Sequence, residues 1–128
     1  MAELKSVMSN KAPAPIGPYS QAIESQGFIF TSGQIALDSA TGQIVPGGVE
    51  AQAGKVFENL KAVLDAGGSG LEYVVKTTIF LKNMDDFGKV NDIYAGYFSK
   101  TLPARSTVEV SRLPKDVLVE VECIAIKR

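Results

Sequence analysis

The segment that decides the fold of this 128-residue chain runs from Tyr73 to Lys82 and reads YVVKTTIFLK. β-Branched and aromatic residues dominate it, which is typical of a strand, and it has too few polar residues for one face to be solvated. Strand side chains alternate between two faces, so one face carries Val75, Thr77, Ile79 and Leu81 and the other carries Val74 and Phe80. We therefore expect a central strand that is covered on both faces.

Two amphipathic helices are expected on either side of this segment. Apolar residues recur at three- and four-residue spacing over roughly 49–66, and the Gly67-Gly68 pair would end this first helix. The pair Asp85-Asp86 can cap a second helix that runs to about Ser99. Its apolar stripe consists of Phe87, Val90, Tyr94 and Phe98. Each helix has one apolar face to bury against a sheet.

Further strands are expected towards both ends of the chain. After a proline-rich loop at 9–18, residues 19–23 and 28–32 are typical of two strands joined by a short turn at Ser25-Gln26-Gly27. Residues 105–110 and 117–126 are typical of two closing strands. The predicted fold is a single α+β domain over residues 1–128, with two helices packed on one face of a mixed sheet.

The other face of this sheet has no predicted cover. Two helices cannot shield both sides of a sheet whose central strand is apolar on each side, and the sequence offers no third amphipathic segment. Self-association of sheet face on sheet face would solve the problem, with two, three or four chains closing the assembly.

Composition excludes several classes of function. The 13 basic and 14 acidic residues leave a net charge of −1 without any like-charged block, so we expect neither a nucleic acid nor a membrane as partner. The sequence has no histidine, which removes Ser-His and Cys-His nucleophiles and most zinc and iron sites. Any chemistry must therefore use carboxylates, tyrosine, arginine, backbone amides or water. With no signal-peptide or membrane-span pattern, we expect a soluble cytoplasmic protein, or a mitochondrial one if its source is eukaryotic.

The single cysteine, Cys123, alternates in step with apolar strand residues at 119, 121 and 125. It is expected to behave as a small buried hydrophobe.

One arginine and two carboxylates stand out because they interrupt apolar strands. Arg105 opens a strand-like run, and Glu120 and Glu122 lie in the last strand. An arginine that is partly buried needs an anion, which could be Glu120 or a ligand. If the two strands adjoin, within one chain or between copies, Arg105 and Glu120 could line one pocket; the residue pattern by itself favours a structural ion pair.

Three further positions have both a structural and a functional interpretation. Tyr19, at the end of the proline-rich loop, is either a packing residue or a pocket phenol. Asn91 lies on the apolar stripe of the second helix, so its amide needs a helix–sheet hydrogen bond or a ligand. Gly33, in the run Thr31–Gln34, marks a bulge or turn, or a close approach to the backbone.

Five segments together carry a more specific pattern: GPYSQA at 17–22, TSGQI at 31–35, PARSTVEV at 103–110, RLP at 112–114 and VEVE at 119–122. They resemble the Rid family of reactive intermediate deaminases, also called YjgF, and in particular its RidA-type branch. The resemblance implies a chorismate-mutase-like fold, assembled as a homotrimer whose sheets form a central barrel with ligand clefts between subunits.

The resemblance also implies an activity and residue roles. The activity is hydrolysis of 2-aminoacrylate, 2-iminopropanoate and 2-iminobutanoate to 2-oxo acids and ammonia, a reaction for which no metal and no cofactor are expected. Position by position, it gives Arg105 as the carboxylate-binding arginine, Glu120 as the water-positioning carboxylate and Tyr19 as the pocket tyrosine. The further substrate-binding positions are Ser32, Gly33, Asn91 and Thr107. Many family members have cysteine where this chain has Thr107; a threonine keeps the backbone amide there, so deamination is expected to survive.

Two alternatives of other classes remain. The same cleft could bind small 2-oxo acids without turnover, or the exposed sheet could act as a holdase. An endoribonuclease or translation-inhibitor activity, ascribed to some relatives, is opposed by the net charge of −1, because RNA affinity depends on clustered basic residues.

Overall fold

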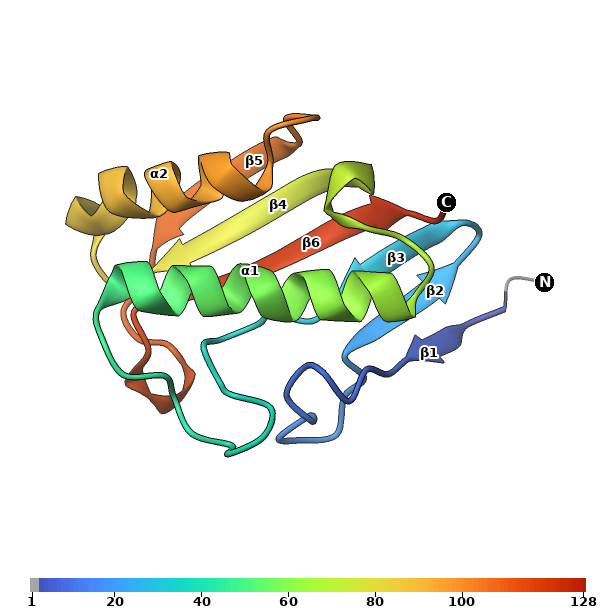
Figure 1. Cartoon of the computed structure of the whole chain (residues 1–128), viewed down its shortest axis with the longest axis horizontal. Helices are drawn as coiled ribbons and strands as arrows, with labels where there is room; N and C mark the ends of the chain where they lie inside the picture. Colours follow the sequence, from blue (N-terminus) through green and yellow to red (C-terminus); the bar gives the residue numbers. More distant parts are fainter. Residues whose placement is uncertain (1–2) are drawn as a thin grey trace.

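The computed structural model describes residues 3–128 (Figure 1). They form one six-stranded sheet with the strand order β1-β2-β3-β6-β4-β5. The strands are β1 (Lys5–Val7), β2 (Ala22–Ser25), β3 (Phe28–Thr31), β4 (Val74–Leu81), β5 (Ala104–Glu109) and β6 (Val119–Ile126). The helices are α1 (Val49–Ala66) and α2 (Phe87–Tyr97), with three short 3₁₀ turns, η1 (Leu71–Tyr73), η2 (Met84–Asp86) and η3 (Pro114–Asp116). The predicted α+β fold with a mixed sheet is confirmed.

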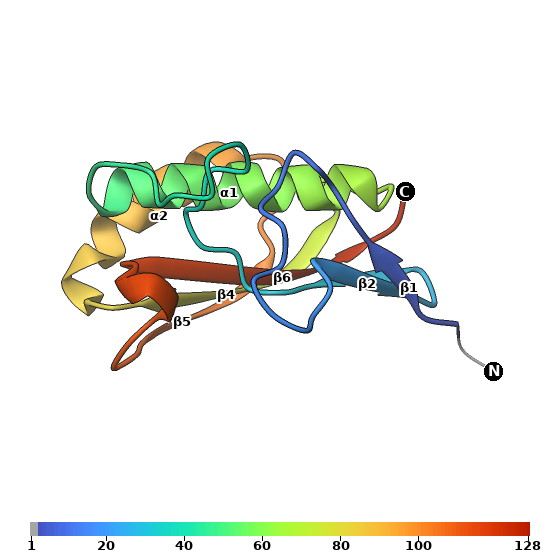
Figure 2. The same cartoon turned by 90° about the horizontal axis from the view of Figure 1, so that it is seen from below.

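Strand pairing follows the connections along the chain. The consecutive strands β1, β2 and β3 are antiparallel neighbours joined by loops, and β6 inserts between β3 and β4 and is antiparallel to both. Strands β4 and β5 are parallel and are connected through α2. Such a crossover packs its helix back onto the sheet. Both helices consequently lie on one face of the sheet, as Figure 2 shows edge-on.

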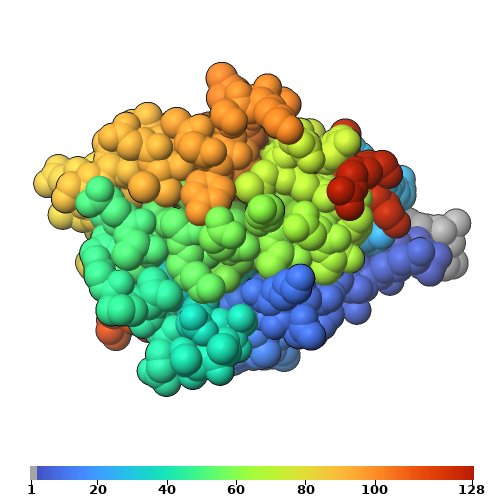
Figure 3. All heavy atoms as spheres, viewed as in Figure 1, coloured from blue at the N-terminus to red at the C-terminus, as the bar shows by residue number. Residues whose placement is uncertain are grey.

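The main core lies between these helices and the sheet. Phe57, Leu60 and Leu64 of α1 are fully buried against alternate residues of β6, including Val121 and Ala125. Burying one such large apolar side chain contributes roughly 1.5–3 kcal/mol, so this layer supplies most of the driving force for folding. Figure 3 shows this side of the molecule closed by α1, α2 and the N-terminal segment.

The first helix begins and ends where the sequence predicts. It spans Val49–Ala66, and the N–H of Gly67 bonds to the carbonyls of Val63 and Leu64 at 3.1 Å. Gly68 then adopts a φ of 77°, which only glycine reaches readily, so the chain turns away from the helix axis.

The predicted start of the second helix needs correction. Asp86 is at the N-cap of α2, but neither it nor Asp85 caps the helix with its side chain; instead Asn83 accepts the Asp85 N–H at 2.9 Å and caps η2. The helix also ends at Tyr97, two residues earlier than expected.

The predicted faces of β4 are wrong at its beginning. A bulge at Val75 shifts the register, so Val74 pairs with Ala125 whereas Lys76 pairs with Ile124. Val74 is therefore buried under the helices together with Thr77, Ile79 and Leu81, and Val75 is exposed. A bulge adds one residue to one strand, which reverses the alternation on one side of it.

The other strands differ from the prediction mainly at their ends. β2 starts at Ala22 rather than at residue 19, β5 covers Ala104–Glu109, and β6 starts at Val119. Strand β1 was not predicted, because its three residues show no apolar alternation. The turn at Gln26-Gly27 is confirmed: both residues have positive φ, 52° and 82°, as a two-residue hairpin loop requires.

The face of the sheet opposite the helices is called the open face below. Register places these side chains on it: Ile23, Phe28, Phe30, Lys76, Thr78, Phe80, Ser106, Val108, Glu120, Glu122, Ile124 and Ile126. Only the end near Phe80 is covered, by a second small cluster that includes Ile35, Leu113 and Val117. The uncovered sheet face expected from the sequence is therefore present. Among residues 3–128, no helix is both long and apolar enough to cross a bilayer.

Candidate functional site

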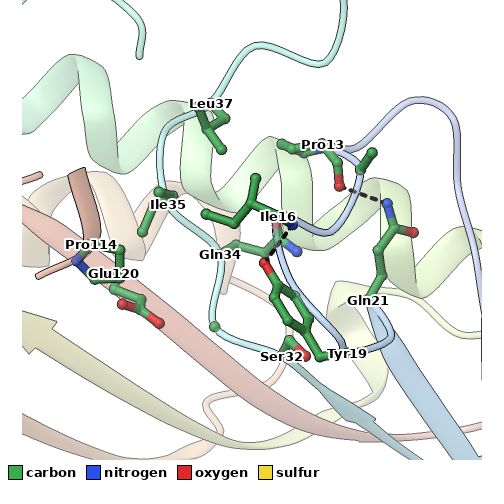
Figure 4. Close-up of a pocket in the computed structure, with 12 residues that line it drawn as sticks. Pro13, Ile16, Tyr19, Gln21, Ser32, Gln34, Ile35, Leu37, Pro114 and Glu120 are labelled. Carbon is green, nitrogen blue, oxygen red and sulfur yellow. Dashed lines mark hydrogen bonds between the residues drawn. The ribbon is translucent and has the colours of Figure 1, made fainter. Parts of the chain in front are cut away.

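Glu120 projects from the open face of β6 into a cavity of about 350 Å³ (Figure 4). The cavity is lined by Pro13, Ala14, Ile16, Tyr19, Gln21, Ser32, Gly33, Gln34, Ile35, Leu37, Pro114 and Glu120. Burial raises the pKa of the Glu120 carboxyl, and the nearby Glu122 raises it further. A carboxyl with a raised pKa is suited to accept and return a proton near neutral pH.

Gly33 makes room for this carboxylate. Phe30 pairs with Ile124 and Gln34 pairs with Val121, so four steps along one segment match three along β6 and one residue bulges between them. A Cβ at position 33 would lie 2.8 Å from the Glu120 Cδ, closer than real Cβ contacts come. Of the two interpretations that the sequence left open, both hold: Gly33 lies in a bulge, and it permits a close approach.

Tyr19 lies across the cavity from Glu120, on the proline-rich loop (Figure 4). Its hydroxyl oxygen accepts the Ile16 N–H at 3.2 Å, and its ring is 46% exposed. The phenol is thus oriented by its own loop and remains accessible at the cavity, which is the arrangement of a pocket residue rather than of a core residue.

A buried glutamine holds this loop in place. Gln21 is 1% exposed, its Oε1 accepts the Ser9 N–H at 2.6 Å, and its Nε2 donates to the carbonyls of Ser9 and Pro13 at 3.0 and 2.8 Å. Because one amide satisfies three backbone groups of the loop, it fixes the position from which Tyr19 enters the cavity. Gln21 was not predicted from the sequence, although a glutamine at the start of an apolar strand is a usable signal.

Ser32, the residue before Gly33, also lines the cavity. Its Oγ donates to the Ser20 carbonyl at 2.7 Å, and its N–H donates to the Gln21 carbonyl at 2.9 Å. The hydroxyl proton is therefore engaged, and the Ser32 oxygen retains lone pairs for a donor in the cavity.

Arg105 lies on the other face of the sheet, between β5 and α2. Its Nη1 donates to Asn91 Oδ1 at 2.8 Å, and its Cζ lies 5.4 Å from the ring centroid of Phe87 and 4.8 Å from that of Tyr94. No ion pair within residues 3–128 includes Arg105. Asn91 provides the helix–sheet hydrogen bond that the sequence allowed, but its side chain is exposed rather than buried.

Thr107 lies two residues further along the same face of β5. Its Oγ1 is buried without a hydrogen-bond partner in the described chain. The N–H of Val110 donates to the Leu81 carbonyl, and bonding alternates in a parallel pair, so the N–H groups of Arg105 and Thr107 point away from β4 along the free edge of β5.

Register separates Arg105 from Glu120 within one chain. Thr77 pairs with Arg105 and Cys123 under the helices, whereas Phe80 pairs with Glu120 on the open face. Directly paired residues point to the same face, so the arginine and the glutamate point to opposite faces with β4 between their strands. The expectation that they share a pocket through adjacent strands of one chain is wrong, and so is an ion pair within one chain.

Cys123 is buried as predicted, at 3% exposure. Its N–H donates to Thr31 Oγ1 at 2.9 Å, and burial raises the pKa of its thiol to about 12. A thiol of this kind is inert as a nucleophile. Within the part of the chain that the structure describes, no cluster of three or more potential metal ligands is found.

Comparisons with known proteins show the family to which the chain belongs. A family model described as Endoribonuclease L-PSP matches residues 9–127. The 2-iminobutanoate/2-iminopropanoate deaminase of Mus musculus is 48% identical over 123 residues, covering 96% of this chain and 91% of the mouse protein. The protein of the same name from Escherichia coli K12 is 46% identical over 127 residues, covering 97% and 98%. A protein of Synechocystis named only as RutC family is 58% identical over 125 residues, covering 96% of each.

Solved structures are similar over the whole chain. A member of the conserved Rid protein family from Yersinia pestis has a TM-score of 0.94 at 48% identity, covering 97% of this chain and 99% of that one. TdcF of Escherichia coli, solved with bound serine, has a TM-score of 0.92 at 40% identity, with the same coverage. With a family match over residues 9–127 and these identities along nearly the full length, the chain belongs to the Rid family, also described as YjgF or Endoribonuclease L-PSP.

Proposed function

We propose that this protein is an enamine/imine deaminase that hydrolyses 2-aminoacrylate, 2-iminopropanoate and 2-iminobutanoate to 2-oxo acids and ammonia. The observation that carries the proposal is the state of Arg105: a guanidinium fixed by Asn91, Phe87 and Tyr94, without a carboxylate partner in the described chain. A fixed guanidinium matches a carboxylate with two parallel hydrogen bonds. All three substrates carry such a carboxylate.

The proposed site combines two copies of the chain. One copy contributes Arg105, Asn91 and the outward N–H of Thr107; the other contributes the cavity of Tyr19, Ser32, Gly33 and Glu120. This combination is supported by the register, which keeps Arg105 and Glu120 on opposite faces within one chain. It also gives the open face a cover, since the second copy would lie against it. We propose the homotrimer implied by the family resemblance as the assembly.

Each step of the proposed reaction needs only these residues and water. Arg105 holds the carboxylate, and Glu120 accepts a proton from a water molecule as its oxygen bonds to the C=N carbon. Because the imine nitrogen is already protonated, this addition gives a neutral carbinolamine. Glu120 then returns its proton to the nitrogen, the C–N bond breaks to release ammonia, and the proton of the carbinolamine hydroxyl passes to the ammonia as the C=O bond forms. For 2-aminoacrylate, protonation of the CH₂ carbon first gives 2-iminopropanoate. Tyr19, which lines the same cavity as Glu120, would orient the water.

Binding without turnover is a second candidate. It is favoured by the structure of TdcF with bound serine, a small carboxylic acid, at 40% identity to this chain. The two functions differ in one measurable respect: a binder holds 2-oxobutanoate but does not accelerate its release from the imine.

The experiment generates 2-iminobutanoate in place with a threonine dehydratase and traps residual imine with semicarbazide. The wild type is expected to increase the release of 2-oxobutanoate. Arg105→Ala is expected to lower this acceleration at least about 100-fold, because a charge-assisted bidentate contact of roughly 3 kcal/mol is lost. Arg105→Lys, which keeps the charge but not the fork of donors, is expected to recover little.

Arg128→Ala is the matched control, since Arg128 is an exposed arginine outside both halves of the site. Full activity of Arg105→Ala would refute the mechanism. An inactive wild type that binds 2-oxobutanoate through Arg105 would establish the non-catalytic function. RNA cleavage that persists in repurified Arg105→Ala would instead support a ribonuclease activity independent of this site.

A further inference from the structure

Three residues on one stripe of α2 hold the Arg105 guanidinium, and two of them are aromatic. Phe87, Asn91 and Tyr94 follow each other at spacings of four and three, so they share the helix face that meets β5. Asn91 engages one guanidinium nitrogen through its Oδ1, whereas Phe87 and Tyr94 present ring faces within 6 Å of Cζ. The two rings attract the cation without using any of its N–H donors.

Tyr94 is itself held in place by the sheet and the core. Its hydroxyl shares a 2.8 Å hydrogen bond with Thr77 Oγ1, and Thr77 is 0% exposed and pairs directly with Arg105 in the sheet. Its ring packs on Phe57 and Phe98, with centroids 5.7 and 4.4 Å away. These contacts fix the position of the Tyr94 ring. The Arg105 side chain must therefore adopt an orientation that fits against this ring.

The choice of an aromatic ring over a carboxylate has a chemical consequence. A carboxylate at this position would take two N–H donors of Arg105 and cancel its charge, so that a substrate anion would compete with it. A ring face leaves the charge and the remaining N–H donors available while still restricting the side chain.

We propose that Tyr94 is a positioning residue for substrate binding: its ring face, tethered through Thr77, holds Arg105 in the orientation that receives the substrate carboxylate. The ring of Phe87 contacts the same guanidinium at the exposed end of this stripe of α2. This inference rests on the proposed function for its substrate, but the arrangement of Arg105 can be tested without any activity.

The kinetic experiment compares Tyr94→Leu, Tyr94→Phe and Phe87→Leu with the wild type on 2-iminobutanoate, and measures 2-oxobutanoate binding by calorimetry. Tyr94→Leu removes the ring and is expected to raise KM and the Kd for 2-oxobutanoate about tenfold, with kcat changed less than about threefold. Tyr94→Phe keeps the ring and is expected to recover binding to within about threefold of the wild type. Phe87→Leu changes a 39% exposed side chain and so tests the same cage without disturbing the core.

Tyr97→Leu is the matched control. Tyr97 is on the same helix and its ring centroid lies 5.2 Å from that of Phe57, but its ring is not one of the two that the Arg105 guanidinium lies over. It is expected to lower stability as Tyr94→Leu does while leaving KM unchanged. Wild-type KM and Kd in both Tyr94→Leu and Phe87→Leu would overturn the proposal, as would an equal rise of KM in Tyr97→Leu.

A spectroscopic measurement separates this inference from the proposed function. The chain contains three arginines, Arg105, Arg112 and Arg128. In ¹⁵N-arginine-labelled protein, the Arg105 Hε resonance is expected to be displaced by the two rings and to return towards the other two signals in Tyr94→Leu. If the wild type neither hydrolyses imines nor binds 2-oxobutanoate, the proposed function fails, and this displacement still decides whether Tyr94 positions Arg105. An Arg105 signal that is unchanged in Tyr94→Leu would overturn the positioning role.

Discussion

At the scale of single residues, the cavity depends on how closely the backbone of Gly33 lies to the side chain of Glu120. Glu120 is held in a half-buried place because Gly33 has no side chain. Burial and the neighbouring Glu122 both favour its protonated form. A chain selected only for stability would have no reason to keep a carboxylate there, which is why this position is a strong candidate for function.

The raised pKa of Glu120 predicts a pH-dependent effect of Glu120→Gln. The carboxyl ordinarily titrates near 4.5, and its folded pKa is higher. Its favourable contribution to folding is therefore complete below about pH 4.5 and is lost as the pH rises through the folded pKa. Glu120→Gln should melt at a higher temperature than the wild type at pH 7 and at the same temperature at pH 4, while deamination falls at least about 100-fold. An equal gain in melting temperature at both pH values would contradict this explanation.

Gly33→Ala is predicted to impair catalysis by moving Glu120. The new Cβ would overlap the carboxylate, so we expect at least about a tenfold loss of kcat together with an overpacking cost of roughly 1–3 kcal/mol. Chemical denaturation and the imine assay measure the two effects.

Two controls accompany this variant. Gly54→Ala, in α1 with nothing within 4 Å of the added Cβ, should stabilise the protein by about 0.5–1 kcal/mol and leave activity unchanged. In a Glu120→Ala background the stability cost of Gly33→Ala should largely disappear. If the cost were the same in both backgrounds, the clash with Glu120 would not be its cause.

At the scale of elements, the sequence predicted what depends on local pattern. The bounds of α1 follow from its regular apolar spacing and from Gly67-Gly68, and the alternation in β6 correctly separates the Glu120 face from the Cys123 face. The bulge at Val75 could not be predicted, because one inserted residue is defined by its partner strand rather than by its own neighbours. For the same reason, the sequence could not predict that β4 lies between β5 and β6. This strand order decides where Arg105 lies relative to Glu120.

The β2–β3 hairpin offers a prediction at this scale. Gln26 has a φ of 52° in a two-residue turn, a conformation that asparagine adopts more readily. We expect Gln26→Asn to stabilise the protein by about 0.5 kcal/mol and Gly27→Ala, at a φ of 82°, to destabilise it by about 1 kcal/mol. Urea unfolding midpoints measure both changes. Gln43→Asn, in another exposed loop, is the control; an equal gain there would show that the turn is not the cause.

At the scale of the whole molecule, the two halves of the proposed site point away from each other. The helix-covered face presents Arg105 at the β5 edge, and the open face presents Glu120 together with the exposed aromatic rings of Phe28 and Phe30. A neighbouring copy that covered the open face would bury these exposed rings. The same contact would bring the Arg105 half of one copy to the Glu120 half of the other.

Mixing two inactive variants tests this arrangement directly. Arg105→Ala and Glu120→Ala should each be inactive, but co-refolded at equal amounts they should regain about one quarter of wild-type activity. In a closed ring with random mixing, about one site in four receives an intact arginine from one chain and an intact glutamate from the next.

The fraction does not depend on the number of subunits, so sedimentation analysis must supply that number separately; we expect three. The control is the double variant Arg105→Ala/Glu120→Ala mixed with wild type at equal amounts. It should also give about one quarter of the activity, because both chains that meet at a site must then be wild type, whereas sites formed within one chain would give about one half. Mixtures of the single variants that remain inactive would show that both residues act within one chain.

The buried thiol of Cys123 determines how the molecule responds to thiol-reactive compounds. The only thiol of the chain lies beneath the helices with a pKa of about 12. Thiol-directed oxidants, alkylating agents and metal ions therefore meet no accessible cysteine on the folded protein. The same molecule should work unchanged during oxidative stress, when enzymes that depend on exposed thiolates are switched off.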